Sequence, residues 1–179
     1  APRGFYVFDG YAAQRVLDNS PGDSSPQSQH LDVAAMYFNE DAGRGGYGGF
    51  LASDLAQNEF LISSAQKMLV GYPIDGISAA NRGRMHATAP MNVAFTRVPS
   101  LDAFSQPFRT YTTPDIRGSG GISGGPLCVQ FEGGNYYPAA IYLGGSNQTV
   151  VRAIDSKIID VITRAQAASA AGENQTDGG

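Results

Sequence analysis

The sequence predicts an all-β fold that is completed by one α-helix near its C-terminal end. Short apolar segments bounded by Gly, Pro, Asn or Asp occupy most of the chain before residue 155, as is typical of sandwiches and barrels. The segment after Ile154 instead spaces its apolar residues as a helix does. With 179 residues, of which 42% are hydrophobic, the chain is long enough to bury one sizeable core or the cores of two small barrels.

The expected strands are short, and turn residues separate them. Two segments between them are expected to be loops, because 19–29 is polar and 43–49 is glycine-rich without the Lys-Ser/Thr ending of a phosphate loop. The apolar segments lie, in chain order, at 4–10, 31–38, 48–54, 59–73, 91–98, 125–131, 136–145 and 148–154.

The C-terminal helix is expected over 156–172. Its apolar residues fall at 158, 159, 161, 162 and 165, which places them on one face. Asp155 or Ser156 is the expected N-cap, and Gly172 stands where a helix commonly ends. Residues 173–179 are expected to form a frayed tail or the start of a linker.

Composition argues against several classes of protein. The net charge is −4 and there is no basic run, so we expect no nucleic-acid partner. The single cysteine, Cys128, rules out an internal disulfide and is expected to be a buried strand thiol. No apolar run approaches the roughly 18 residues that a membrane span requires.

The stretch RGSGGISGGPLCVQF, residues 117–131, surrounds Ser123 with glycines and then turns apolar. A serine hydroxyl attacks a carbonyl only if a base takes its proton and donors stabilise the resulting oxyanion. Backbone amides converge on one point only in a tightly folded loop, which glycines permit. The amides of Gly121 and Ser123 are therefore a candidate oxyanion-binding pair; the alternative is a hairpin loop with an incidental serine.

This stretch resembles the nucleophile motif Gly-x-Ser-Gly-Gly-Pro of the trypsin/chymotrypsin-like serine peptidases. HLDVAAMYF is similar to the family's strand that carries the triad aspartate, which selects Asp32, and MLVGYP to the strand that opens the second barrel. AAIYLGG resembles the strand along the substrate, with Gly144 21 residues after Ser123, and VVRAIDSKIIDVI the last strand and helix.

The resemblance implies a double β-barrel whose first barrel is incomplete. Residues 1–60 are expected to be the latter part of the first barrel, 61–155 the second barrel, 156–172 the helix and 173–179 the tail. If the strands at 4–10 and 31–38 lack barrel neighbours, we expect an open sheet that exposes apolar side chains.

Three departures from the family qualify this interpretation. Ile122 replaces the aspartate that pairs with a newly cut N-terminus in activated zymogens, so we expect no activation of that kind. Tyr142 stands where the family often has a serine behind the triad. The family's triad residues follow the chain order His, Asp, Ser. His30 lies only two residues before Asp32, and on a strand these two side chains would share a face. His86 falls in the segment that resembles the second barrel. We therefore expect the catalytic histidine to belong to sequence that precedes Ala1.

The leading interpretation is a serine endopeptidase that cleaves protein or peptide substrates through an acyl-enzyme on Ser123, without metal or organic cofactor. By resemblance, Tyr142, Leu143 and Gly144 line the substrate, and Arg117 lies at the base of the specificity pocket, where it would favour acidic side chains; alternatively it points to solvent or pairs with Asp115. The resemblance also implies a secreted or periplasmic protein. Two rivals remain: a pseudoprotease that only binds peptides or partner proteins, and an extracellular β-sandwich binding module.

Overall fold

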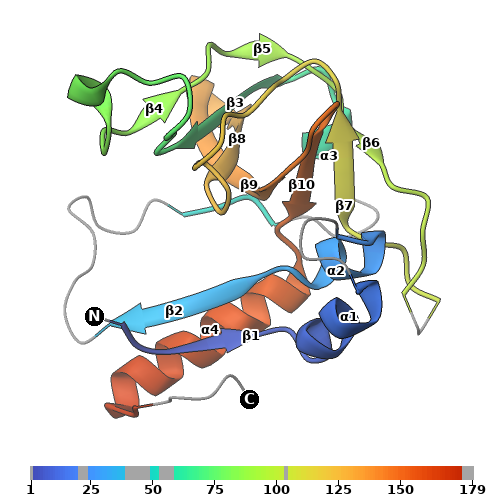
Figure 1. Ribbon diagram of the computed structural model, residues 1–179, viewed down its shortest axis with the longest axis vertical. Coiled ribbons are helices and arrows are strands. Elements are labelled where there is room, and N and C mark those ends of the chain that lie inside the picture. Colours follow the sequence, from blue (N-terminus) through green and yellow to red (C-terminus); the bar gives the residue numbers. More distant parts are fainter. Residues whose placement is uncertain (1, 20–23, 39–48, 53–58, 103–104, 175–179) are drawn as a thin grey trace. The chain divides into compact units, whose positions relative to one another are not determined.

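The computed structural model describes residues 2–19, 24–38, 49–52, 59–102 and 105–174. The chain divides into two compact units (Figure 1). The terminal unit consists of Ala1–Gly48 and Asp155–Gly179, and the central unit of Gly49–Ile154. The expected glycine-rich loop at 43–49 lies outside the described residues except for Gly49.

The terminal unit is a two-stranded antiparallel sheet with a helix along one face. Strand β1 (Pro2–Val7) pairs with β2 (Ala34–Phe38), and α4 (Ser156–Ala171) packs along both (Figure 1). Tyr6 and Tyr37 stack with their ring centroids 6.2 Å apart, and the Arg164 guanidinium lies 5.1 Å from the centroid of the Tyr6 ring. The small core between sheet and helix consists of Tyr37, Ala165 and Ala168, with Tyr6 and Ala35 against it.

The predicted C-terminal helix is confirmed, together with its caps. The Asp155 carboxylate accepts a hydrogen bond of 3.1 Å from the Ile158 amide, which identifies Asp155 as the N-cap. Gly172 ends the helix at φ 71°, and its amide donates to the carbonyls of Ala168 and Ser169. Both signals lie within a few residues of the helix they delimit, which is why the sequence contained them.

Two helices occupy the connection between β1 and β2: α1 (Tyr11–Asp18) and α2 (Pro26–Leu31). The expectation that 19–29 is loop throughout was therefore wrong. Ser25 caps α2 by accepting from the Ser28 amide, and Pro26 occupies the first helical turn, where its missing N–H costs nothing. Because residues 19–29 are polar, the sequence pattern did not predict that α2 begins at Pro26.

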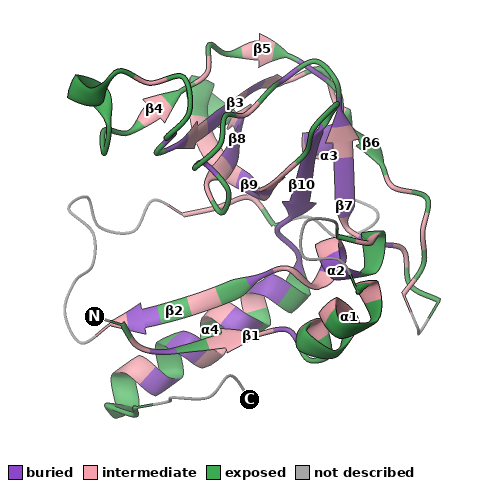
Figure 2. Cartoon of the chain, in the orientation of Figure 1, coloured by how far each residue is buried: buried purple, intermediate pink, exposed green. Residues whose placement is uncertain are grey.

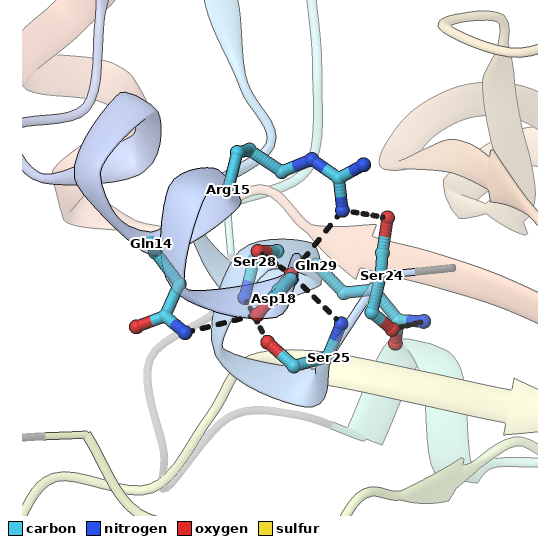
Figure 3. Close-up of polar contacts among 7 residues, drawn as sticks. All are labelled: Gln14, Arg15, Asp18, Ser24, Ser25, Ser28 and Gln29. Atoms are coloured by element: carbon cyan, nitrogen blue, oxygen red, sulfur yellow. Dashed lines mark hydrogen bonds and ion pairs between the residues drawn. The ribbon is translucent and has the colours of Figure 1, made fainter. Parts of the chain in front are cut away.

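Asp18 joins the two helices through a network of hydrogen bonds (Figure 3). Its carboxylate accepts from the Ser28 hydroxyl, from the Ser25 amide at 3.1 Å, from the Gln14 amide group at 3.0 Å and from the Arg15 guanidinium at 3.2 Å. These hydrogen bonds hold the pKa of Asp18 well below its ordinary value, so the carboxylate stays charged.

The other face of the two-stranded sheet exposes apolar side chains. Phe5 and Met36 are directly opposed across the ladder, and they are 37% and 61% exposed. The expectation of an open sheet with exposed apolar residues is confirmed for the described part of this unit, in which β1 and β2 pair only with each other.

The central unit is an antiparallel sheet of eight strands in the order β4-β3-β8-β9-β10-β7-β6, with β5 paired to β3. Because β5 pairs with β3 and β6 with β7, the segment 91–97 connects two strands that are far apart in this order. The strands are β3 (Gln66–Gly71), β4 (His86–Ala87), β5 (Met91–Asn92), β6 (Thr96–Arg97), β7 (Thr110–Thr113), β8 (Pro126–Phe131), β9 (Asn135–Gly144) and β10 (Thr149–Ala153).

Short helical turns interrupt the sheet of the central unit. They are α3 (Glu59–Ile62), η1 (Ala79–Asn81) and η2 (Glu132–Gly134). The expected strand at 59–73 is thus a helical turn followed by β3. The described residues are otherwise mostly antiparallel sheet with a C-terminal helix, as predicted.

The core of the central unit is formed mainly by side chains of β3, β7, β8, β9 and β10. Strand β10 is buried along its whole length (Figure 2). The fourteen buried members of the core are Leu61, Leu69, Val93, Phe95, Tyr111, Ile116, Ile122, Leu127, Val129, Ala139, Ala140, Tyr142, Val151 and Ala153. None of the helices in the described ranges is long and apolar enough to cross a bilayer.

Candidate active site around Ser123

The candidate nucleophile lies in a loop, residues 117–125, which we call the serine loop; it ends where β8 begins. Ser123 is exposed, whereas its neighbour Ile122 is buried and belongs to the core. Ser123 is therefore exposed to solvent, while the adjacent Ile122 side chain is buried in the core.

Two consecutive turns shape the serine loop. The Ile122 amide donates to the Ser119 carbonyl at 3.3 Å, and the Gly125 amide donates to the Ile122 carbonyl at 2.9 Å. The third residues of these turns, Gly121 and Gly124, have φ of 96° and 83°. Because side chains disfavour positive φ, glycine at these two positions is what lets the turns follow each other directly.

The two turns leave the predicted oxyanion donors available. The amides of Ile122, Gly124 and Gly125 donate to carbonyls, whereas those of Gly121 and Ser123 donate to no carbonyl within the described residues. Backbone amides left unbonded in successive tight turns form anion-binding concavities. In this loop they accompany the exposed Ser123, so a candidate nucleophile and two hydrogen-bond donors lie within three consecutive residues.

The predicted substrate-lining residues lie on β9, next to the serine loop. The Gly124 amide donates to the Tyr142 carbonyl, and the Tyr142 amide to the Gly125 carbonyl, each at 2.8 Å. Tyr142 is buried, and burial raises the pKa of its phenol, whereas Leu143 and Gly144 are partly exposed. Gly121, Ser123 and this end of β9 are thus brought together.

Asp32 lies in the terminal unit, directly after α2, as its C-cap. The expectation that it enters a strand was wrong, because β2 begins two residues later. The Tyr11 hydroxyl donates a hydrogen bond to the Asp32 carboxylate; burial first, and the charge and hydrogen bond of Asp32 next, raise the pKa of Tyr11. Asp32 and Ser123 lie in different units.

The two histidines lie in different units, His30 in the terminal unit and His86 in the central unit. His30 is buried on α2, so the expectation that it shares a strand face with Asp32 was wrong. His86 lies on β4, where its Nε2 is 3.4 Å from the Asn81 carbonyl oxygen. In the described part of the central unit, no hydrogen bond links His86 to Ser123.

Arg117, the predicted specificity residue, is exposed. The carboxylate of Asp115, its alternative partner, instead accepts a 3.4 Å hydrogen bond from the Thr113 hydroxyl. No three His, Cys, Asp or Glu residues among those described are grouped so as to hold a metal ion. Burial raises the pKa of the Cys128 thiol, which keeps it protonated at neutral pH.

Two features of these units escaped the sequence analysis. Tyr11 is 21 residues away from Asp32, and no local pattern marks their contact. Lys67 is fully buried on β3, where its ammonium donates to the carbonyls of Ser63, Ala65 and Val93 at 2.6, 3.0 and 2.5 Å. Burial lowers the pKa of Lys67 to about 8. A lysine within an apolar segment was the available signal, but it did not identify the acceptors.

Comparison with known proteins gives no family for this chain: no protein-family model matches it, and no curated protein matches it.

Proposed function

We propose that this chain is part of a trypsin-like serine endopeptidase in which Ser123 is the nucleophile. The observation that carries the proposal is the double turn of the serine loop, in which the Gly121 and Ser123 amides donate to none of the carbonyls that the structure describes, beside the exposed Ser123. An acyl-transfer enzyme needs this combination, because the oxyanion of the tetrahedral intermediate must be met by donors already in position.

In the proposed reaction, Ser123 Oγ forms a bond to the carbonyl carbon of the scissile peptide while its proton passes to a general base. The carbonyl oxygen becomes an oxyanion that accepts from the Gly121 and Ser123 amides. The base returns the proton to the leaving amine as the C–N bond breaks, which leaves an ester on Ser123. Water then attacks the ester by the same route and releases the acid.

Asp32 orients the general base in this proposal. Its carboxylate already has one fixed donor, the Tyr11 hydroxyl, which leaves oxygen lone pairs for a histidine ring N–H. The family order of His, Asp and Ser takes that histidine from sequence upstream of Ala1. In the same proposal the protein acts outside the cytoplasm, and Arg117 favours acidic side chains before the scissile bond.

The strand pairing supports the fold part of the proposal. In a barrel of the trypsin type, the two edges of the sheet must come together. The segment 91–97 begins with β5, which pairs with β3, and ends with β6, which pairs with β7, so it spans from one part of the sheet to the other. The two-stranded sheet of the terminal unit is, in this proposal, part of the first barrel.

A fluorophosphonate probe tests the nucleophile. The protein is expressed both as residues 1–179 and with whatever sequence the gene encodes upstream, and labelling and peptide cleavage are measured for wild type, Ser123→Ala and Ser119→Ala. We expect Ser123→Ala to abolish labelling and to lower cleavage by roughly 10³-fold or more. Ser119→Ala is the matched control, because Ser119 is exposed in the same loop. Unchanged cleavage by Ser123→Ala would refute the proposal.

A peptide-binding pseudoprotease is the second candidate, and the placement of His86 favours it. His86 Nε2 lies 3.4 Å from the Asn81 carbonyl oxygen, and within the described part of the central unit no hydrogen bond links His86 to Ser123. This candidate predicts that the longer protein binds peptides yet neither reacts with the probe nor cleaves them. Labelling of Ser123 that depends on a histidine would rule it out.

A further inference from the structure

We propose that Ile122 is a positioning residue, which fixes the two oxyanion-binding amides by anchoring the serine loop inside the core of the central unit. Residues 72–75, which we call the strap, hold the loop from a second direction. This inference rests on the proposed function. It assigns the work of holding the loop to packing and backbone hydrogen bonds rather than to an ion pair.

The Ile122 side chain fits against two glycines. It is 7% exposed and shares the core with Leu69 and Tyr142. A Cβ on Gly71, in β3, would lie 2.9 Å from Ile122 Cβ, and a Cβ on Gly118 would lie 2.8 Å from Ile122 Cδ1. A side chain at Gly71 or Gly118 would therefore displace Ile122, which shows that the Ile122 side chain packs directly against the backbone at both glycines.

The backbone of Ile122 belongs to both turns of the serine loop. Its amide closes the first turn on Ser119, and its carbonyl closes the second by accepting from Gly125. The Gly121 and Ser123 amides flank it on either side in the chain. Because Ile122 belongs to both turns, holding its side chain in the core also holds both turns in place. The orientation of the Gly121 and Ser123 amides is then held as well.

The strap holds the residue before this pair. The Gly120 carbonyl accepts from the Ile74 amide at 2.8 Å and from the Asp75 amide at 3.3 Å. A Cβ on Gly121 would lie 2.8 Å from the Ile74 nitrogen and 3.0 Å from the Tyr72 carbonyl oxygen, so the strap passes directly against the loop. Since the Gly120 carbonyl and the Gly121 amide belong to one planar peptide, fixing the carbonyl also fixes the direction of that N–H.

Loosening either contact should therefore act on catalysis through the oxyanion donors. Removal of a single oxyanion donor typically costs about 10²–10³ in kcat. Ile122→Ala should cost about 10²-fold in kcat with little change in KM, and Ile122→Val should recover most of that loss. Ile62→Ala is the matched control, because Ile62 is half exposed on α3, outside the serine loop and the strap.

The strap is tested by removing the backbone N–H of Ile74. Ile74→Pro eliminates the shorter of the two hydrogen bonds that the Gly120 carbonyl accepts, whereas Ile74→Ala keeps it. Ile74 is 60% exposed, so these variants should fold even if Ile122→Ala does not. We expect Ile74→Pro to lower kcat by roughly 10-fold more than Ile74→Ala.

The amides are followed directly by NMR, which separates this inference from the proposed function. In the longer protein, at a temperature at which every variant is folded, the Gly121 and Ser123 amide resonances should move in Ile122→Ala and Ile74→Pro and stay in place in Ile62→Ala. If wild type neither cleaves nor labels, the proposed function fails, while moving amides still support the anchor. Amides that do not move, or amides that move while kcat stays at the wild-type value, would overturn the positioning role.

Discussion

The ring of Tyr142 lies directly against Gly118: a Cβ on Gly118 would be 2.5 Å from both Cζ and the hydroxyl oxygen of Tyr142. Real Cβ atoms do not come this close to their neighbours, so position 118 has no room for a side chain while Tyr142 keeps its place. This contact joins β9 to the serine loop, because Gly118 belongs to the loop and Tyr142 to the strand.

Gly118→Ala should therefore destabilise the protein by about 1–3 kcal/mol, the usual cost of overpacking a closed core. Chemical denaturation measures the change, with Ser119→Ala as the exposed control in the same loop. In a Tyr142→Leu background the penalty should shrink, because the ring that the added methyl group would strike is gone. Equal penalties in both backgrounds would contradict the contact.

Asp32→Asn should lower the pKa of Tyr11. Burial is the largest cause of the raised pKa and remains in the variant, but the substitution removes the negative charge of Asp32 that disfavours the phenolate. An NMR titration of the Tyr11 ring measures the shift, and Asp9→Asn, an exposed carboxylate close in sequence to Tyr11, is the control. If Tyr11 titrates identically in wild type and Asp32→Asn, the hydrogen bond between α1 and the end of α2 is absent.

Asp18→Asn should lower the midpoint of thermal unfolding at neutral pH, since the network between α1 and α2 is built on a charged acceptor. Because the folded pKa of Asp18 is depressed, its contribution is present above the unfolded pKa of about 3.9 and is lost as pH falls below it. The difference between wild type and Asp18→Asn should therefore narrow between about pH 5 and pH 2. An exposed carboxylate, in Asp9→Asn, should show no such narrowing.

Lys67 should make stability rise with pH above its folded pKa of about 8. Between pH 8 and the unfolded value of about 10.4, the unfolded chain binds more protons, so the free energy of unfolding increases by up to about 1.4 kcal/mol per pH unit. Cys128 acts in the opposite direction near pH 9, because its pKa is raised on folding.

The comparison with Lys67→Met isolates this contribution, because Cys128 is present in both proteins. Urea unfolding at pH 8 and pH 9 should show wild type gaining about 1 kcal/mol relative to Lys67→Met over that interval. Lys157→Met, at an exposed lysine on α4, is the matched control. A difference that stays constant with pH would mean that Lys67 is not buried as a cation.

The sequence by itself determined the features that a few neighbouring residues encode. The C-terminal helix, with Asp155 and Gly172 at its ends, follows from periodicity and capping, which act within one or two turns. Strands β1 and β8 follow from the short apolar runs at 4–10 and 125–131, which lie between turn residues. The exposed Ser123 and its glycine turns are equally local, because φ at each position depends on that residue.

The tertiary structure alone decided which distant residues meet. The contact between Tyr11 and Asp32, the Lys67 ammonium on the Val93 carbonyl and the Gly71 surface against Ile122 all join residues separated by 20 or more positions. It also made α2 a helix where polar composition indicated a loop, since Asp18 supplies acceptors for the start of α2 from another helix. Such long-range contacts form only when burial and strand pairing bring distant segments together, and the spacing of residues within one segment does not predict which segments meet.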